Sequence, residues 1–261
     1  MRQIERLQTL ISKEVLLKSE IEVVGKISSA SNATFLVKLL DGSQAVYKPV
    51  KGERPLWDFE SESLGRREMA AYVFLENVDI PVPTTVWRDD LSFGPGILQS
   101  WIEIDEVLAV NIVKVSDVYP KPWINSIVGH DANDQEVALI HRDDSSLRKI
   151  ALVDLVMNNA DRKASHLLHS NEVWFPIDHG LTWHVDFKLR TVLWGWGDLE
   201  FDPEEQKFLK RSFSVVAKDS LLDWISIEER DAALDRIETL LESNHWPSPA
   251  PSAHVLPWPI Y

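Results

Sequence analysis

Asn159-Ala160-Asp161-Arg162-Lys163-Ala164-Ser165-His166, followed at residues 177–180 by Ile-Asp-His-Gly, is the most informative part of the sequence. It comes after a helical pattern that ends near Met157, and it brackets a short predicted hairpin. Asp161 and Asp178 are therefore expected in loops beside strands, with His166 five residues after Asp161. Two carboxylates and an imidazole in neighbouring loops form a candidate reactive site.

The residues before this site predict an antiparallel meander. A helix is expected over residues 4–17, and strands over 21–27, 34–40 and 45–48. Asp41-Gly42 is a strong hairpin turn signal between the second and third strands. Short polar turns between consecutive strands favour antiparallel pairing.

The third strand ends with Lys48, directly before Pro49, which ends the strand. A helix is predicted over residues 64–76, and it carries Glu68. Two further strands are expected at 85–87 and 96–102. A lysine at a strand end and a glutamate in the following helix can form an ion pair.

The second half is predicted to be mainly helical. Residues 105–142 show no clear pattern, and a helix is expected from Asp143 to about Met157. Asp202-Pro203-Glu204-Glu205 is a typical helix start, and Ser226 with Glu229 forms a capping box. The proline-rich tail from Trp246 is expected to lie extended on the surface.

The charge distribution predicts a domain boundary near residues 103–110. Residues 1–103 hold 12 basic and 15 acidic residues, and the remainder holds 15 and 26. This shift coincides with the change from strands to helices. We therefore expect a nucleotide-binding lobe over residues 1–104 and a catalytic lobe over 105–261.

Composition excludes several classes of protein. The formal net charge of −14 argues against a generally basic nucleic-acid binder and against adhesion to an anionic membrane surface. No apolar run is long enough to span a bilayer, and the first residues lack the apolar region of a signal peptide. The absence of cysteine excludes disulfides and thiolate chemistry. We expect a cytoplasmic protein without a transmembrane segment and without a nucleic-acid partner; its oligomeric state is open.

The order of the polar residues suits phosphoryl transfer. That reaction needs a carboxylate near the attacking hydroxyl, ligands for Mg²⁺ and a cation on the nucleotide phosphates. Asp161, His166 and Asp178 supply the first two in the expected order, and Lys48 supplies the cation.

Three motifs together resemble a known superfamily: Val46-Tyr47-Lys48-Pro49, Asn159-Ala160-Asp161-Arg162 and Ile177-Asp178-His179-Gly180. They look like the phosphatidylinositol 3-/4-kinase superfamily, nearest to its type II phosphatidylinositol 4-kinase-like branch and the HipA-like bacterial kinases. The longer stretch of residues 48–59, with 67–72 and 189–196, resembles a small actinobacterial family usually described as such kinases.

The resemblance implies an α+β fold of the two-lobed protein-kinase-like type, with ATP and Mg²⁺ between an antiparallel sheet plus helix and a mainly helical lobe. It implies transfer of the ATP γ-phosphate to a hydroxyl of an acceptor that is a lipid headgroup, a small alcohol or a protein Ser/Thr. Asp161 would orient the acceptor hydroxyl, and Lys48, held by Glu68, would pair with the α/β-phosphates. His166 and Asp178 would bind the metal. The implied nucleotide-binding residues are Ser28, Ser29, Ser31, Asn32, Lys48, Gln99, Trp101 and Glu103.

Two departures from the family pattern leave an alternative open. His166 stands where these kinases usually carry a metal-binding Asn, so Mn²⁺ is a second candidate metal. The turn at residues 28–32 also lacks the glycines of a phosphate-binding loop. The alternative is a pseudokinase, a nucleotide-binding regulatory module without transfer. Self-phosphorylation of the serines in that turn is also open.

Structural explanations compete with several of these assignments. Asp161 and Arg162 could form a loop-stabilising pair, and Trp57 is expected to pack in the core, with a lid anchor as the alternative. Trp194 and Trp196 are expected in the core, although a role at an acceptor site is conceivable. A zinc hydrolase built on the histidines between His166 and His184 is a third reading, without the H-E-x-x-H signature.

Overall fold

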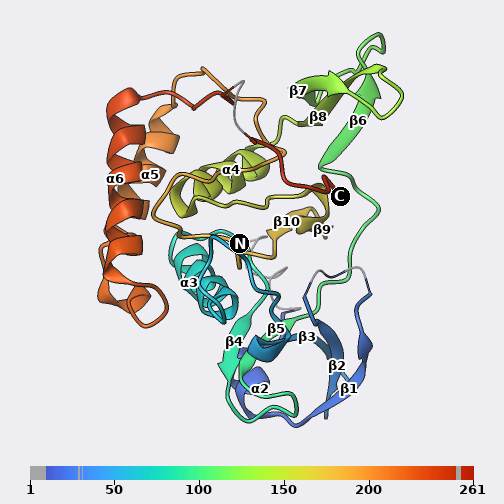
Figure 1. Cartoon of the computed structure of the whole chain (residues 1–261), viewed down its shortest axis with the longest axis vertical. Helices are drawn as coiled ribbons and strands as arrows, with labels where there is room; N and C mark the ends of the chain where they lie inside the picture. The colour runs from blue at the N-terminus through green and yellow to red at the C-terminus, as the bar shows by residue number, and fades with distance from the viewer. Residues whose placement is uncertain (1–9, 29, 31, 251–253) are drawn as a thin grey trace.

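The structure, a computed structural model, describes residues 10–28, 30, 32–250 and 254–261. Within these residues the chain forms a mixed fold with antiparallel sheets and five α-helices (Figure 1). The helices are α2 (Lys13–Lys18), α3 (Leu64–Asn77), α4 (Ser145–Met157), α5 (Pro203–Val216) and α6 (Ile227–Ser243). The strands of the largest sheet are β1 (Ile21–Lys26), β2 (Phe35–Leu39), β3 (Gln44–Pro49), β4 (Thr85–Arg88) and β5 (Gly96–Ser100).

The five-stranded sheet has the order β1-β2-β3-β5-β4, and all its pairs are antiparallel. The meander of β1, β2 and β3 confirms the pattern in the sequence, and Asp41 supports its tight turn by accepting from the N–H and hydroxyl of Ser43. Strand β3 is central, because β2 and β5 flank it. Lys48, near the end of β3, pairs in register with Ile97 of β5, which fixes its place in the sheet.

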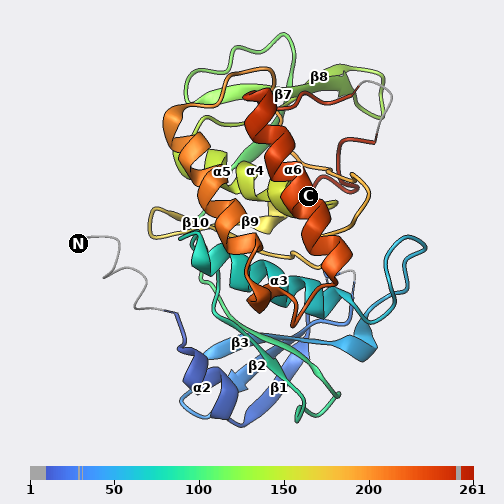
Figure 2. The same ribbon diagram turned by 90° about the vertical axis from the view of Figure 1, so that its left-hand side faces the viewer.

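Helix α3 lies between this sheet and the helices of the second half (Figure 2). Ten of its residues are buried, among them Phe74 and Leu75, which are fully inaccessible. They join one large hydrophobic core with α4, α5 and α6. Because α3 is buried on nearly all sides, its rotation about its own axis is restricted by packing.

The expected helices of the second half begin as the sequence predicts. Asp144 caps α4, accepting from the N–H groups of Ser146 and Leu147. Asp202 and Ser226 form complete capping boxes at the starts of α5 and α6. No helix among the described residues is long and apolar enough to cross a membrane.

Residues 105–142, which show no clear pattern in the sequence, contain a three-stranded antiparallel sheet. Its strands are β6 (Val110–Lys114), β7 (Trp123–His130) and β8 (Glu136–Arg142), in the order β6-β8-β7. Figure 1 shows it beyond α4, far from the five-stranded sheet. Four consecutive residues of β8 are buried, which removes the alternation that identifies a half-exposed strand. The second half is therefore less purely helical than expected.

Two strands lie beside the predicted reactive loops. They are β9 (Leu167–Ser170) and β10 (Val173–Pro176), which pair antiparallel as a short hairpin. Trp194 and Trp196 are buried in the large core, which confirms their expected packing role and leaves no surface for an acceptor. Trp57, expected in the core, is instead 91% exposed.

The proline-rich tail is attached rather than loose. The carbonyl oxygen of Ile260 accepts from the N–H of Ala164, and that of Val255 accepts from the N–H of Thr191 and the indole N–H of Trp194. Residues 255, 256 and 260 also pack against the large core. The tail therefore lies against the loop that begins at Asp161.

Candidate functional site

The site begins with an ion pair between β3 and α3. The Nζ of Lys48 donates to both carboxylate oxygens of Glu68, at 2.8 and 3.1 Å. Both side chains are largely buried, with 19% of Lys48 and 6% of Glu68 exposed. The sequence predicts this pair, and its burial makes the lysine position well defined.

Asp178 brings a second carboxylate to the same ammonium. It follows β10, and its Oδ1 accepts from the Nζ of Lys48 in a short contact. Its backbone has a φ of +56°, in the left-handed region that aspartate tolerates better than most residues. The Asp178 side chain is 44% exposed, so it is the most accessible member of the three.

The three charges shift one another. Burial disfavours the ammonium of Lys48, but Asp178 and Glu68 together hold its pKa above the ordinary value. Burial acts against the charge of Asp178 too, yet the ammonium holds its pKa well below the usual carboxyl range. Burial raises the pKa of Glu68, and repulsion from Asp178 adds to the rise. When two carboxylates share one cation, the negative charge of one disfavours ionisation of the other, so their pKa values differ.

Asp161 lies in the loop after α4, where Lys163 is its partner. The Nζ of Lys163 lies 3.1 Å from Oδ2 of Asp161, and both are mostly buried. Burial raises the pKa of Asp161, although Lys163 opposes the rise, and the nearby Asp178 adds to it. Lys163 was not predicted as a site residue. The signal in the sequence that could have found it is a basic residue two positions after a loop carboxylate.

Arg162 does not pair with Asp161, the alternative that the sequence left open. Its guanidinium instead forms two bonds of 2.8 Å with Asp154 of α4, and both side chains are fully buried. A further nitrogen donates to the carbonyl oxygens of His166 and Ile177. Arg162 therefore ties the Asp161 loop to the strand that leads to Asp178.

His166 lies beside Asp178. Its Nε2 is 3.4 Å from Oδ2 of Asp178, and its buried Nδ1 has no hydrogen-bond partner. Burial lowers its pKa to about 4, with Asp178 acting in the opposite sense, so the ring is neutral at pH 7. A neutral imidazole and a carboxylate this close are compatible with two ligands of one divalent cation. The donor set therefore fits a metal, although Mg²⁺ prefers oxygen ligands.

The remaining predicted nucleotide-binding residues are less closely joined to this cluster. Asn32 is half-buried and accepts from the N–H of Arg54. Gln99 is buried, donates to Thr85 and lies next to Glu68. Ser28, Trp101 and Glu103 are exposed. Ser29 and Ser31 lie outside the described residues. Nucleotide contacts of these side chains stay predictions.

The histidines do not form a zinc site within the described part of the chain. No group of three or more His, Cys, Asp or Glu side chains there could hold a metal ion. His184 accepts from the N–H of Asp186, as a structural residue would. His179 is buried, and burial holds its pKa well below the ordinary value. A hydrolase with three protein ligands to zinc is therefore not supported.

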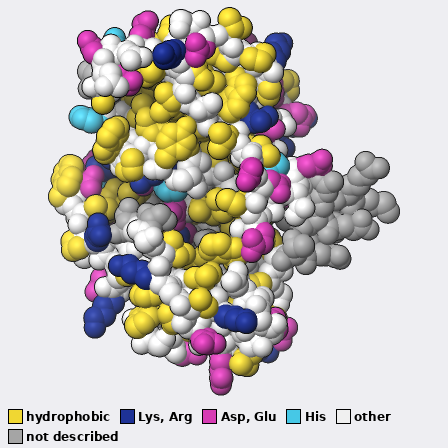
Figure 3. Space-filling model, turned by 90° about the vertical axis from the view of Figure 1, so that its right-hand side faces the viewer, with side chains coloured by type: hydrophobic (Ala, Val, Ile, Leu, Met, Phe, Trp, Pro, Cys, Tyr) yellow, Lys and Arg dark blue, Asp and Glu magenta, His cyan; other side chains and the backbone are white. Residues whose placement is uncertain are grey.

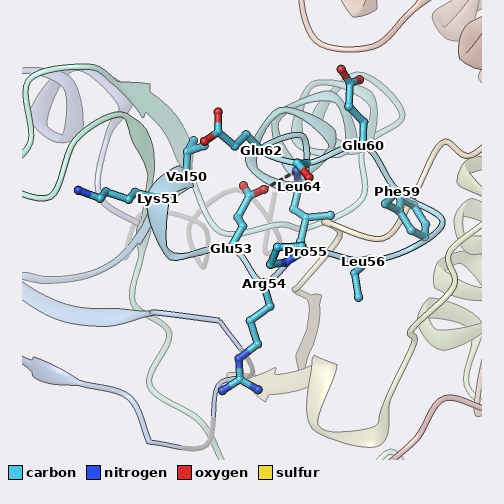
Figure 4. Close-up of a pocket in the computed structure, with 11 residues that line it drawn as sticks. Val50, Lys51, Glu53, Arg54, Pro55, Leu56, Phe59, Glu60, Glu62 and Leu64 are labelled. Atoms are coloured by element: carbon cyan, nitrogen blue, oxygen red, sulfur yellow. Dashed lines mark hydrogen bonds between the residues drawn. The ribbon is translucent and has the colours of Figure 1, made fainter.

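A pocket of about 160 Å³ lies beside the start of α3, outside the charged cluster (Figure 4). It is lined by eleven residues between Val50 and Leu64. The carboxylate of Glu53 accepts from the N–H groups of Leu64 and Gly65, and so occupies the helix start itself. None of Lys48, Glu68 or Asp178 lines this pocket.

The segment that joins the two halves and the tail carry exposed hydrophobic side chains. These are Trp101, Ile104, Leu108, Trp258 and Tyr261. Figure 3 shows hydrophobic side chains gathered over one face of the molecule, with Lys, Arg, Asp and Glu side chains scattered among and around them.

Comparison with known proteins identifies a family. The chain is 36% identical to Protein Rv2133c of Mycobacterium tuberculosis over 265 residues, which covers 95% of this chain and 94% of that protein. The chain belongs to the family of this mycobacterial protein, whose name states no activity. No family model matches the sequence.

A solved structure shows a weak likeness. The crystal structure of a Helicobacter pylori proinflammatory kinase, CtkA, covers 88% of this chain and 94% of its own, with 11% identity and a TM-score of 0.49. A likeness of this size is too low to assign fold or activity.

Proposed function

We propose that the protein is an ATP-dependent phosphotransferase that transfers the γ-phosphate of ATP to a hydroxyl group. The observation that supports this best is the convergence of Glu68 and Asp178 on the Nζ of Lys48. Three elements distant in sequence meet there, in the order and with the residue types that kinase-type phosphoryl transfer uses. The proposed arrangement is two-lobed and of the phosphatidylinositol 3-/4-kinase-like kind, with residues 1–104 and 105–261 as the lobes.

Lys48 would bind the α/β-phosphates. Glu68, which is 6% exposed, holds the ammonium by two bonds and limits its movement. A preorganised cation needs little reorganisation when the anionic phosphates arrive, so its binding energy is available to position them. The turn at residues 28–32 would cover the phosphates, and Gln99, Trp101 and Glu103 would border the adenine.

Asp161 would orient the acceptor hydroxyl and accept its proton at a carboxylate oxygen. Burial raises its pKa, which makes the carboxylate a better base than an exposed aspartate. Lys163, whose Nζ lies 3.1 Å from the same carboxylate, would stabilise negative charge on the transferred group. Arg162 and Asp154 hold the loop in place from below.

Asp178 and His166 would hold a divalent cation, Mg²⁺ or Mn²⁺. When bound, such a cation supplies charge neutralisation between the phosphate oxygens. Asp178 can serve because its pKa lies well below the usual range, so its carboxylate is ionised at pH 7. The neutral ring of His166 offers nitrogen where an oxygen ligand is usual, which favours Mn²⁺ more than an oxygen-only set would.

One observation favours a second candidate, a nucleotide-binding module without transfer. His166 is a nitrogen donor whose other ring nitrogen is buried and unpartnered, so its orientation is not fixed by a hydrogen bond. Metal-ligating histidines are usually held by such a bond. A His166 side chain that is held loosely would bind the metal–nucleotide complex without aligning its γ-phosphate for transfer.

Calorimetry of ATP binding with Mg²⁺, Mn²⁺ and EDTA tests the proposal. Wild type should bind ATP only with a metal, and Asp178→Ala should lose that dependence. Asp90→Ala is the control, because Asp90 is also ion-paired, but its partner is Arg88 and it forms no ion pair with Lys48. ADP formation and intact mass after incubation with ATP then separate a kinase from a binding module. Absence of ATP binding under every condition would contradict both functions.

A further inference from the structure

A buried guanidinium links helix α3, which carries Glu68, to the segment that follows Asp178. Arg67 directly precedes Glu68 in α3, and its side chain is 6% exposed. Its Nε donates to Oγ of Ser63 at 3.2 Å, and its Nη1 donates to the carbonyl oxygen of Thr182 at 2.7 Å. Its Nη2 pairs with Glu229 of α6 in a short contact. Three separate segments therefore meet at one side chain.

The Thr182 contact leads to Asp178. The hydroxyl of Thr182, which is fully buried, donates to the carbonyl oxygen of His179 at 2.7 Å. His179 is the residue after Asp178. Gly180 lies against the first turn of α3, where a Cβ would come within 3.2 Å of the Leu64 Cβ. Residues 178–182 thus rest directly on α3, and Arg67 fastens them there.

The Glu229 contact leads to α6. Glu229 is the third residue of that helix, and its Oε2 accepts from the N–H of Ser226 while its Oε1 pairs with Arg67. One carboxylate therefore completes the capping box of α6 and neutralises Arg67. Because the capping box fixes Glu229, its partner is fixed as well.

We propose that Arg67 is a positioning residue, which couples Glu68 to Asp178 and so holds both carboxylates on Lys48. Neighbouring residues of a helix turn together. A rotation of α3 that moved Glu68 away from Lys48 would also withdraw Arg67 from Thr182 and Glu229. Conversely, displacement of residues 178–182 would break the bond that restrains α3. The planar guanidinium of Arg67 bonds to three partners that lie in different directions. The single ammonium of a lysine does not reproduce this arrangement. For its effect on ATP, this proposal rests on the proposed function.

The neighbouring residue supplies a matched control. Arg66 also joins α3 to the second half, because its Nη2 donates to the carbonyl oxygen of Asp223 at 2.7 Å. Its guanidinium lies 6.0 Å from the ring centre of Trp224. Arg66 makes no hydrogen bond to residues 178–182. A variant at Arg66 therefore loosens α3 from the second half without breaking the connection to Asp178.

The first test compares Arg67→Lys, Arg67→Met and Arg66→Met in calorimetry of ATP with Mn²⁺ or Mg²⁺, beside thermal melting without ligand. We expect both Arg67 variants to weaken metal–ATP binding at least tenfold relative to Arg66→Met, with Arg67→Lys retaining more of the melting temperature than Arg67→Met. Equal ATP affinities for Arg67→Lys and Arg66→Met would overturn the proposal. If Arg67→Met does not fold, the ATP affinities of Arg67→Lys and Glu229→Gln are compared with that of Arg66→Met instead.

The second test needs no nucleotide. Melting temperatures are measured for Arg67→Lys, Asp178→Asn and the double variant, and for the same cycle with Arg66→Met. Residues without direct contact normally contribute additively. We expect the Arg67 cycle to depart from additivity and the Arg66 cycle to be additive. Additivity in both would refute the coupling. If the Arg67 cycle is non-additive but the protein binds no ATP, the coupling between Arg67 and Asp178 is supported and the proposed phosphotransferase function is rejected.

Discussion

Arg162 and Asp154 form a fully buried, bidentate ion pair directly beneath the loop that carries Asp161. The two bonds are 2.8 Å long, and Asp154 also accepts from the side-chain amide of Asn159. The reactive loop is thus supported by charges that do not face the proposed substrates. Its geometry depends on this pair as much as on the residues that would perform chemistry.

Asp154→Asn should destabilise the protein strongly. The substitution leaves the Arg162 guanidinium buried without a counter-charge, and breaking one side of a buried pair costs about 3–5 kcal/mol. Urea unfolding measures the change. Glu204→Gln is the control, because its pair with Lys207 is 70–80% exposed and should contribute less than about 1 kcal/mol. A loss below that figure for Asp154→Asn would show that Arg162 finds another partner or water.

Lys48→Met should reduce the affinity for metal–ATP by at least about tenfold, equivalent to about 1.4 kcal/mol. The substitution removes the cation proposed for the phosphates and leaves two carboxylates facing each other, Glu68 and Asp178. Calorimetry with ATP and Mn²⁺ measures the change. Lys38→Met, an exposed position on the neighbouring strand β2, is the control and should bind as wild type does. Unchanged binding by Lys48→Met would place the nucleotide elsewhere.

The elements of the fold follow largely from local sequence patterns. The turn at Asp41-Gly42, the caps at Asp202 and Ser226, and the helix with Glu68 are all local signals, and the structure confirms each of these elements. Strand β8, within residues 105–142, lacks such a signal because it is buried on both faces. The alternation of apolar and polar residues that identifies a strand requires one exposed face. A strand that is covered on both faces therefore lacks this alternation.

The candidate site is predictable only in part, for a similar reason. Lys48 and Glu68 are 20 residues apart on consecutive elements, so their pairing follows from the order of strand and helix. The contacts of Arg67 reach residues 182 and 229, and nothing in the local sequence indicates these partners. The exposure of Trp57 and the attachment of the tail to Ala164 also depend on the tertiary arrangement.

His141 should give the protein a measurable loss of stability in mild acid. It is fully buried; its Nδ1 donates to the carbonyl oxygen of Arg142 and its Nε2 accepts from the N–H of Gly195. Burial lowers its pKa from 6.5 to about 4. Between these two pH values His141 is protonated in the unfolded chain and neutral in the folded protein. The stability that it contributes above pH 6.5 is therefore lost as the pH falls toward 4.

This loss can be isolated by comparing wild type with His141→Gln. The variant is less stable at pH 7 because the histidine bonds are altered. The difference between wild type and His141→Gln in the free energy of unfolding should narrow by up to about 3 kcal/mol between pH 7 and pH 4, because only wild type loses stability through His141. Urea unfolding at several pH values measures it, with His130→Gln at the exposed end of β7 as the control. A difference that stays constant with pH would mean that folding leaves the pKa of His141 unchanged.

His166→Asn should change the metal preference of ATP binding. The neutral ring places a nitrogen 3.4 Å from the Asp178 carboxylate, and the amide oxygen of asparagine would replace it with a donor that Mg²⁺ prefers. The ratio of ATP affinity with Mg²⁺ to that with Mn²⁺ should rise by about fivefold or more, since softer nitrogen donors favour the transition metal. His169→Asn is the control: His169 is similarly buried and lies 3.0 Å from a carboxylate, that of Asp105. Its ratio should equal that of wild type. An unchanged ratio in His166→Asn would remove His166 from the metal site and leave Asp178 as its one assigned ligand.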